Sequence, residues 1–135
     1  MGARYVADTN VVIDLVLGRL PAASATWLDA QLTKQQVVIS VITRIELLGK
    51  LVPAPEAAFL QSFVQAVDVL PLAEPVIQHT ILLRQQHRTK LPDAIIAATA
   101  LAHGLPLLTR NTGDFGALPG LQVLDPHDAG KLPPL

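Results

Sequence analysis

Four acidic side chains stand where the chain leaves predicted strands, and carboxylates gathered at such a place can perform hydrolytic chemistry. The chain contains eleven Asp and Glu residues in all. Three of the four follow a predicted strand or lie in the first turn of a helix that follows a loop there, and the remaining one lies within two turns of a strand end. They are Asp8, Glu46, Asp93 and Asp114.

Carboxylates that converge in a mostly aliphatic protein repel one another and raise one another's pKa unless a cation compensates their charge. A hard divalent cation such as Mg²⁺ or Mn²⁺ meets this need, because it prefers oxygen ligands and retains several waters. It can also generate hydroxide from a bound water and stabilise the charge that develops in phosphodiester cleavage. The four acids therefore predict a site for Mg²⁺ or Mn²⁺ that hydrolyses phosphodiesters.

Each acid also has an ordinary structural interpretation. Asp8 could be the N-cap of a helix, and Asp93 could complement a helix dipole in a first turn. Glu46 stands three residues after Thr43, which is the spacing of a capping box, and Asp114 could end a turn. It is the shared position of the four acids near strand ends that favours a functional site.

Basic residues lie close to these acids in the sequence. Positive charge around an acidic metal site suits a phosphate backbone that passes along it. Ordinary solvated surface charge is the alternative interpretation for each of them. The candidate phosphate-binding residues are Arg44, Arg88, Lys90 and Arg110.

The elements that must position these side chains alternate between strand and helix along the whole chain. Such alternation predicts βαβ crossovers and a mostly parallel sheet with helices on both faces, a three-layer αβα sandwich whose site lies beyond the carboxyl ends of the strands. We expect residues 1–135 to form one such domain. Strands are expected at 5–7, 37–39, 68–72, 106–109 and 121–124, and helices at 11–17, 22–32, 41–51, from Pro53 or Pro55 onward, at 74–87 and at 92–104, with a turn or single helical turn at 111–117 and an irregular tail.

Composition narrows the class of protein. Half of the 135 residues are hydrophobic, which excludes intrinsic disorder, and the absence of Cys excludes disulfides, thiolate zinc sites and a Cys nucleophile. A formal net charge of -1 argues against binding nucleic acid through a broad basic face, although not against nucleic acid as a substrate. No targeting signal or stretch of about 20 apolar residues is visible, so we expect a cytoplasmic protein without a membrane span.

Around the same acids the sequence resembles the PIN-domain ribonucleases, specifically the VapC-type toxins of toxin–antitoxin pairs. Four blocks in order carry the resemblance, and together they span most of the chain. They are residues 5–11 (YVADTNV), 42–47 (ITRIEL), 91–100 (LPDAIIAATA) and 108–115 (LTRNTGDF).

The resemblance implies a metal-dependent endoribonuclease that cuts single-stranded regions of RNA. Asp8, Glu46 and Asp93 match the family's first three acids, and the fourth position falls on Asp114 or on Asn111. Asp8, Asp93 and Asp114 would bind Mg²⁺ or Mn²⁺, and Glu46 would act through a water as general base. A supporting hydrogen bond to Asp8 or to a metal-bound water is expected from Thr109.

The same resemblance implies partners. A cognate antitoxin would wrap the protein and place a basic side chain in the acidic cleft. Homodimers are usual in the family, so a dimer is expected here as well.

Two other enzymes and a binding module compete with this interpretation. Residues 8–12 (DTNVV) resemble the nucleophile motif of haloacid-dehalogenase-like phosphatases with Asp8 as the nucleophile, but Asn10 stands where that motif has its second acid. A PIN nuclease of RNA processing that is not a toxin is the second alternative. A receiver-like signalling domain would have paired acids after the first strand, where Asp8 is followed by Thr9.

Overall fold

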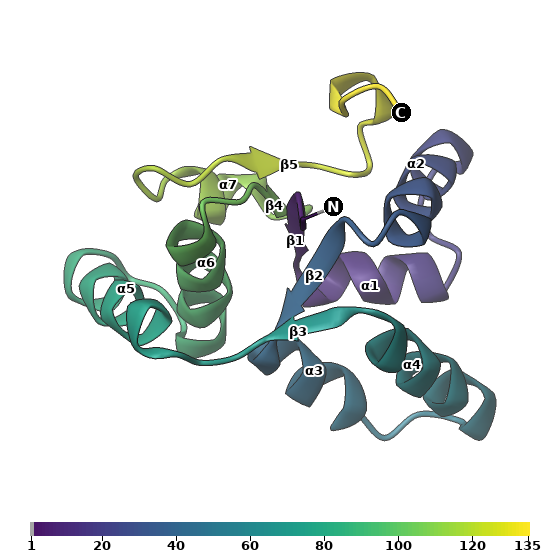
Figure 1. The fold of residues 1–135 in the computed structure, drawn as a ribbon, viewed down its shortest axis with the longest axis horizontal. Helices are drawn as coiled ribbons and strands as arrows, with labels where there is room; N and C mark the ends of the chain where they lie inside the picture. Colours follow the sequence, from purple (N-terminus) through teal and green to yellow (C-terminus); the bar gives the residue numbers. More distant parts are fainter. Residues whose placement is uncertain (1) are drawn as a thin grey trace.

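The computed structural model describes residues 2–135 and is built around a five-stranded sheet, whose arrangement can be followed in Figure 1. All strand pairs are parallel, and their order across the sheet is β3-β2-β1-β4-β5. The chain therefore starts in the middle of the sheet, extends it to one side and then returns to fill the other. The strands are β1 (Tyr5–Ala7), β2 (Val37–Ser40), β3 (Asp68–Leu70), β4 (Leu107–Leu108) and β5 (Val123–Leu124).

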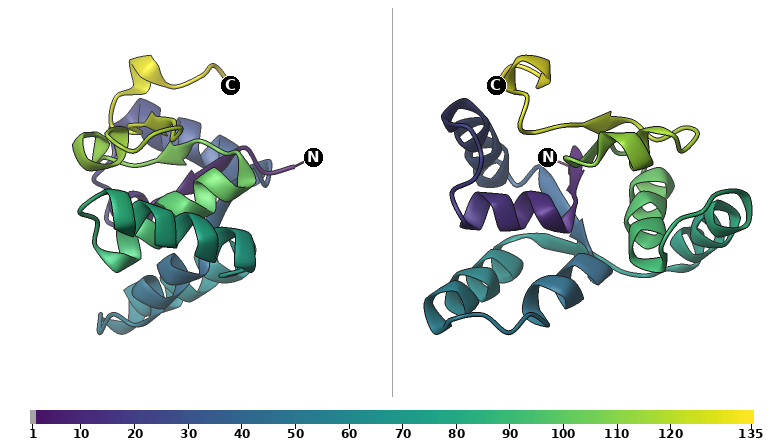
Figure 2. Two further views of the ribbon diagram at one scale, coloured as in Figure 1. Left: turned by 90° about the vertical axis from the view of Figure 1, so that its left-hand side faces the viewer. Right: turned by 180° about the vertical axis from the view of Figure 1, so that it is seen from behind.

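Helices cover both faces of this sheet, which confirms the predicted αβα sandwich (Figure 2). Helices α1, α2 and α4 pack on one face, and α5, α6 and α7 pack on the other. Helix α3 follows β2 directly at the carboxyl edge of the sheet. The bounds are α1 (Thr9–Val16), α2 (Ala22–Thr33), α3 (Val41–Leu48), α4 (Ala54–Ala66), α5 (Glu74–Gln86), α6 (Leu91–His103) and α7 (Thr112–Gly116).

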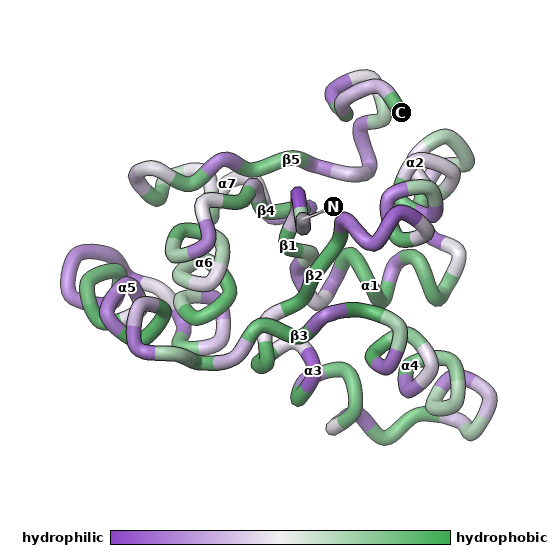
Figure 3. Tube along the Cα trace, viewed as in Figure 1, coloured by the Kyte–Doolittle hydropathy of each residue, from purple (hydrophilic) through white to green (hydrophobic). Residues whose placement is uncertain are grey.

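The strands supply side chains to two cores because successive residues of a strand point to opposite faces. Tyr5 and Ala7 enter the core beneath α1 and α2, whereas Val6 enters the core beneath α5 and α6. Hydrophobic residues accordingly run along the central strands β1 and β2 in Figure 3. A strand buried on both faces explains why these segments are apolar throughout rather than alternating.

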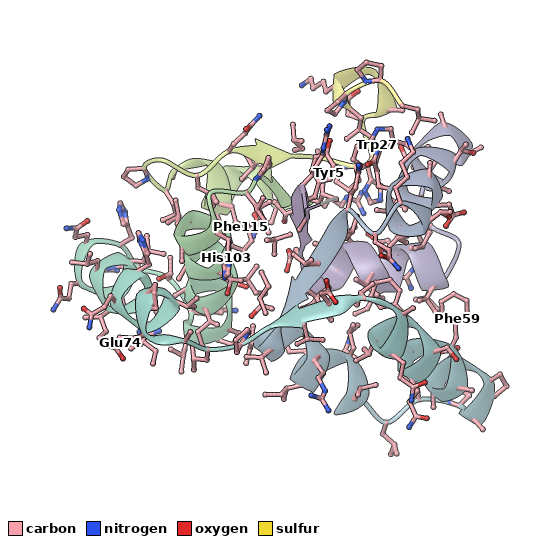
Figure 4. The ribbon with its side chains drawn as sticks, viewed as in Figure 1. Tyr5, Trp27, Phe59, Glu74, His103 and Phe115 are labelled. Carbon is pink, nitrogen blue, oxygen red and sulfur yellow. The ribbon has the colours of Figure 1, made fainter. Side chains whose placement is uncertain are left out.

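Buried aromatic side chains help to hold helices against the sheet (Figure 4). Tyr5 of β1 and Trp27 of α2 meet edge to face, with ring centroids 5.2 Å apart and an interplanar angle of 69°. Phe115 of α7 is buried in the core that α5 and α6 share. Burying Phe115 fixes the short helix α7, which carries Asp114, against the sheet.

The structure differs from the sequence predictions mainly at element ends. Helix α1 begins at Thr9, two residues early, because Asp8 caps it, and α3 ends at Leu48 rather than Leu51. The tail is not wholly irregular, since Ala129–Lys131 form a 3-10 helix. It is held by a 2.7 Å hydrogen bond from the Trp27 indole to the Pro133 carbonyl, a contact that local sequence patterns do not reveal. No helix within residues 2–135 is long and apolar enough to cross a membrane.

Candidate active site at the carboxyl edge of the sheet

The fold brings all four acid-bearing segments to one edge of the sheet. Asp8 follows β1, and Glu46 lies on α3, which starts where β2 ends. Asp93 lies in the first turn of α6, and Asp114 lies on α7, just beyond β4. Because β2, β1 and β4 are neighbours and parallel, their carboxyl ends meet at the same edge. This strand order brings Asp8, Glu46 and Asp114 to that edge. Asp93, whose helix follows α5 rather than a strand, joins them there, since it influences the pKa of Asp8 and is influenced by Glu46 and Asp114.

Asp8 is the most buried of the four acids, with 4% of its surface exposed. Its Oδ1 accepts a 2.8 Å hydrogen bond from the Thr9 N–H and caps α1, as the structural interpretation predicted. Its Oδ2 accepts a 2.9 Å hydrogen bond from the Thr109 hydroxyl, as the sequence also predicted. Capping uses one lone pair of one oxygen, so this carboxylate retains acceptor positions for a cation.

Glu46 is half-buried, and the side chain that donates a hydrogen bond to it lies on another helix rather than on its own. The Thr9 hydroxyl of α1 donates to Glu46 Oε1 at 2.7 Å. The capping-box interpretation is wrong, because the N-cap of α3 is Ser40, whose Oγ accepts from the Ile42 N–H at 3.2 Å. Thr43 instead lies inside α3, with its hydroxyl 3.0 Å from that of Thr9.

Asn111 and Asp114, the two candidates for the fourth acidic position, lie beside each other at the start of α7. The Asn111 amide donates to Asp114 Oδ2 at 3.1 Å, and the Asp114 N–H donates to Asn111 Oδ1 at 3.3 Å. Asn111 is thus the cap of α7, and Asp114 lies in its first turn. Asp114 supplies the charge and Asn111 holds it in place.

Burial and neighbouring carboxylates shift the pKa of two of the four acids, Asp8 and Asp93. Burial raises the pKa of the Asp8 carboxyl, and the carboxylates of Asp93 and Glu46 raise it further, while the hydrogen bonds from Thr109 and Thr9 lower it. Burial likewise raises the pKa of Asp93, with contributions in the same direction from Glu46 and Asp114 and an opposing one from the Lys90 ammonium. The ion pairs of residues 2–135 involve none of the four site acids.

The donor chemistry of this edge suits a hard cation. Its acidic side chains offer oxygen ligands, and the charge of the buried Asp8 is compensated by hydrogen bonds alone, with no ion pair to it among the described residues. In the part of the chain that the structure describes, no three or more His, Asp or Glu side chains already stand as a ligand set. A cation held at this edge would therefore take one or two carboxylates directly and keep several waters, a coordination that Mg²⁺ accepts.

A cleft of about 430 Å³ opens beside the acids. Asp93 and Asp114 line it together with Arg88 and Lys90, two of the predicted phosphate-binding residues. The other two, Arg44 and Arg110, are exposed but are not among the residues that line it. His87 and Thr89 also line the cleft but were not among the predicted site residues. Their place in the loop before Asp93 was the only sequence feature that could have indicated them.

An αβα domain with carboxylates gathered at the carboxyl edge of its sheet matches known proteins along nearly its whole length. The PIN domain family model matches residues 5–121. A VapC ribonuclease of Sinorhizobium fredii, Y4jK, is 31% identical, with 91% of this chain and 97% of the relative covered.

Solved structures agree. A toxin–antitoxin complex from Klebsiella pneumoniae contains a chain that is 33% identical with a TM-score of 0.73, covering 90% of this chain and 97% of that one. DNA-bound VapBC from Salmonella typhimurium has a TM-score of 0.78 at 25% identity, over 92% of this chain and 98% of that one. The chain belongs to the PIN-domain family, among its VapC-type members. These matches favour the PIN interpretation over the phosphatase alternative.

Proposed function

We propose that this protein is a VapC-like toxin, an endoribonuclease that depends on Mg²⁺ or Mn²⁺ and is restrained by a cognate antitoxin. One observation carries the proposal: four acids from four separate segments share one edge of the sheet, and two of them have pKa values raised partly by the others. Perturbed pKa values cluster at functional sites, and the VapC-type relatives are ribonucleases by name.

We assign each of the four acids a role from its position in the site. Asp8 and Asp93 would hold the principal cation, with Asp114 assisting from the rim of the cleft. Such a cation supplies an activated water and neutralises charge on the phosphate. Glu46, fixed by Thr9, would accept the proton of the attacking water as general base.

Binding of RNA would depend on the loop between α5 and α6. Arg88 and Lys90 bring positive charge to the cleft that Asp93 and Asp114 also line. A phosphodiester attracted to these two basic side chains would therefore lie near the acids. Arg44 and Arg110, farther from the cleft lining, would contact phosphates flanking that position.

A charge-removing substitution tests the site. Asp93→Asn keeps the shape of the side chain and should slow RNA cleavage in Mg²⁺ by about 100-fold or more, as loss of a group acting directly in the reaction does. Asp29→Asn, on the exposed face of α2, is the matched control and should cleave like the wild type. Cleavage by Asp93→Asn at the wild-type rate would refute the assignment.

The antitoxin should bind the exposed apolar surface on α3 and α4. Ile45, Leu48 and Phe59 are between 41% and 59% exposed, and Leu51, in the loop between the two helices, is fully exposed. Burying such side chains on a partner would remove them from water. The Klebsiella relative was solved as a complex with its antitoxin, which supports a partner of this kind.

A homodimer is the remaining expected assembly. Native mass spectrometry of the isolated protein checks it, and the expected result is twice the chain mass of 14.4 kDa. A species at the mass of one chain alone would contradict it.

A further inference from the structure

Thr43 of α3 makes a hydrogen bond that leaves its own helix. Its side chain is fully buried, and its hydroxyl lies 3.0 Å from the Thr9 hydroxyl of α1, 34 residues away in the sequence. Thr9 is itself buried and contacts Glu46 Oε1 at 2.7 Å. Thr43 thus reaches Glu46, its neighbour one turn later on the same helix, by way of another helix.

Three threonines on other helices behave differently from Thr43 and Thr9. Thr33, Thr80 and Thr99 each donate to the carbonyl four residues earlier, at 2.7 to 2.9 Å. That bond satisfies the hydroxyl within its own helix, including the buried hydroxyls of Thr80 and Thr99, and needs no partner elsewhere. Thr43 departs from this pattern and joins α3 to α1 at the candidate site.

The number of hydroxyl protons decides which group donates in each hydrogen bond among Thr43, Thr9 and Glu46. A threonine hydroxyl has one proton to donate. Thr9 gives its proton to the Glu46 carboxylate, since this is the shorter and charge-assisted contact. The 3.0 Å contact must then be a donation from the Thr43 hydroxyl to Thr9 Oγ1, and each bond polarises the next.

We propose that Thr43 is a positioning residue for ribonucleolysis, which holds Glu46 through the Thr43–Thr9–Glu46 relay. Donation from Thr43 keeps the Thr9 hydroxyl turned toward Glu46, and Thr9 in turn fixes the carboxylate. The inference rests on the proposed function in one respect, that Glu46 acts in RNA cleavage. Thr43 is fully buried and would reach neither substrate nor cation, so its effect should appear in kcat with KM unchanged.

The test compares two substitutions of Thr43. Thr43→Val keeps the shape and removes the hydroxyl, and it should lower kcat about tenfold on a fluorescein-labelled single-stranded oligoribonucleotide of mixed sequence. Thr43→Ser retains the hydroxyl and should restore kcat to within about twofold of wild type. Thr80→Val, which removes a buried hydroxyl bonded only within α5, is the control and should leave kcat unchanged.

A second substitution shows whether Thr43 acts through Glu46. In a Glu46→Gln background, Thr43→Val should lower kcat by a further factor of less than about two, because positioning matters only while the carboxylate is present. A wild-type kcat for Thr43→Val, or a full tenfold loss in the Glu46→Gln background, would overturn the relay. If Thr43→Val fails to fold, the serine variant and Thr43→Ala are compared in the same way.

A readout without catalysis separates failure of the relay from failure of the proposed function. In the metal-free protein, the carbon-13 resonance of the Glu46 carboxyl should move in Thr43→Val in the same direction as in Thr9→Val, and should stay in place in Thr43→Ser. An unmoved resonance in Thr43→Val would refute the relay even if RNA is cleaved. A moved resonance together with a wild-type protein that does not cleave RNA would refute the proposed function and leave the relay standing.

Discussion

The hydroxyl of Thr109 donates to Oδ2 of Asp8 at 2.9 Å, between residues 101 positions apart in the sequence. Parallel pairing places them together, because Ala7 of β1 is in register with Leu108 of β4 and each strand ends one residue before its polar side chain. The Asn111 N–H donates to Thr109 Oγ1 at 3.0 Å. With that acceptor position occupied, the hydroxyl proton is directed at Asp8.

Removing this donor should weaken cation binding. Thr109→Val leaves Oδ2 of Asp8 without its hydrogen bond, which raises the pKa of that carboxyl further and makes the carboxylate a less well-fixed ligand. We expect about tenfold more Mn²⁺ for half-maximal RNA cleavage and about 1 kcal/mol less free energy of unfolding. Metal titration of the activity and urea unfolding measure the two effects.

The control for this prediction is Thr99→Val, which removes a buried hydroxyl that bonds only within α6. It should lose stability without any change in the Mn²⁺ requirement. An unchanged Mn²⁺ requirement in Thr109→Val as well would show that the Asp8 bond has no part in cation binding.

The raised pKa values of Asp8 and Asp93 predict how the metal-free protein responds to pH. Both carboxyls take up protons at a higher pH in the folded protein than in the unfolded protein. At pH values between the folded and the unfolded pKa, the folded state therefore binds more protons. Their contribution to the free energy of unfolding therefore rises as pH falls from 7 toward their ordinary value of 3.8. Thermal unfolding of the metal-free protein over this range measures the effect.

Asp8→Asn isolates the charge, because Asn remains a good N-cap for α1. This variant should have a higher melting temperature than wild type in EDTA at pH 7 and a flatter dependence of melting temperature on pH. Saturating Mg²⁺ should stabilise the wild type more than the variant. If the metal-free wild type instead loses stability steadily as pH falls from 7 to 5, the burial and repulsion of these two carboxylates do not dominate the pH dependence of its stability.

The sequence predicted the layers and the four acids because both depend on local patterns. Strand segments apolar throughout indicate a sheet buried on both faces, and Asp8 and Asp93 stand beside an unmistakable strand end and helix start. The hydrogen bonds among Thr9, Thr43 and Glu46 were not predictable, since they depend on how α1 packs against α3. The capping-box error at Thr43 has the same origin, because the spacing is local whereas the true partner of its hydroxyl is 34 residues away.

The salt dependence of the affinity for RNA should reveal which basic side chains bind its phosphates. Arg88→Ala and Lys90→Ala should each reduce the slope of log affinity against log salt concentration by about 0.7, the value for one phosphate contact of a single strand. Fluorescence anisotropy with a labelled oligoribonucleotide in Ca²⁺ or EDTA, where cleavage is slow, measures this slope. Smaller reductions are expected for Arg44→Ala and Arg110→Ala, which lie outside the cleft lining.

The matched control is Lys34→Ala. Lys34 is exposed and precedes β2, so it lies toward the amino edge of the sheet, opposite the candidate site. Its removal should leave the slope unchanged. Equal effects for Lys34 and Lys90 would indicate diffuse attraction rather than binding along the cleft.

A single charge on the apolar surface of α4 should release the protein from its antitoxin. Phe59 is 52% exposed, so Phe59→Asp should not disturb folding but should weaken the complex with the small protein encoded beside its gene by at least about tenfold. Ile81→Asp on α5 makes a similar change, from 45% exposure, in the other helical layer and serves as the control. In co-expression, the partner should relieve growth arrest caused by the wild type and by Ile81→Asp, but not that caused by Phe59→Asp. Relief of all three would place the antitoxin elsewhere on the molecule.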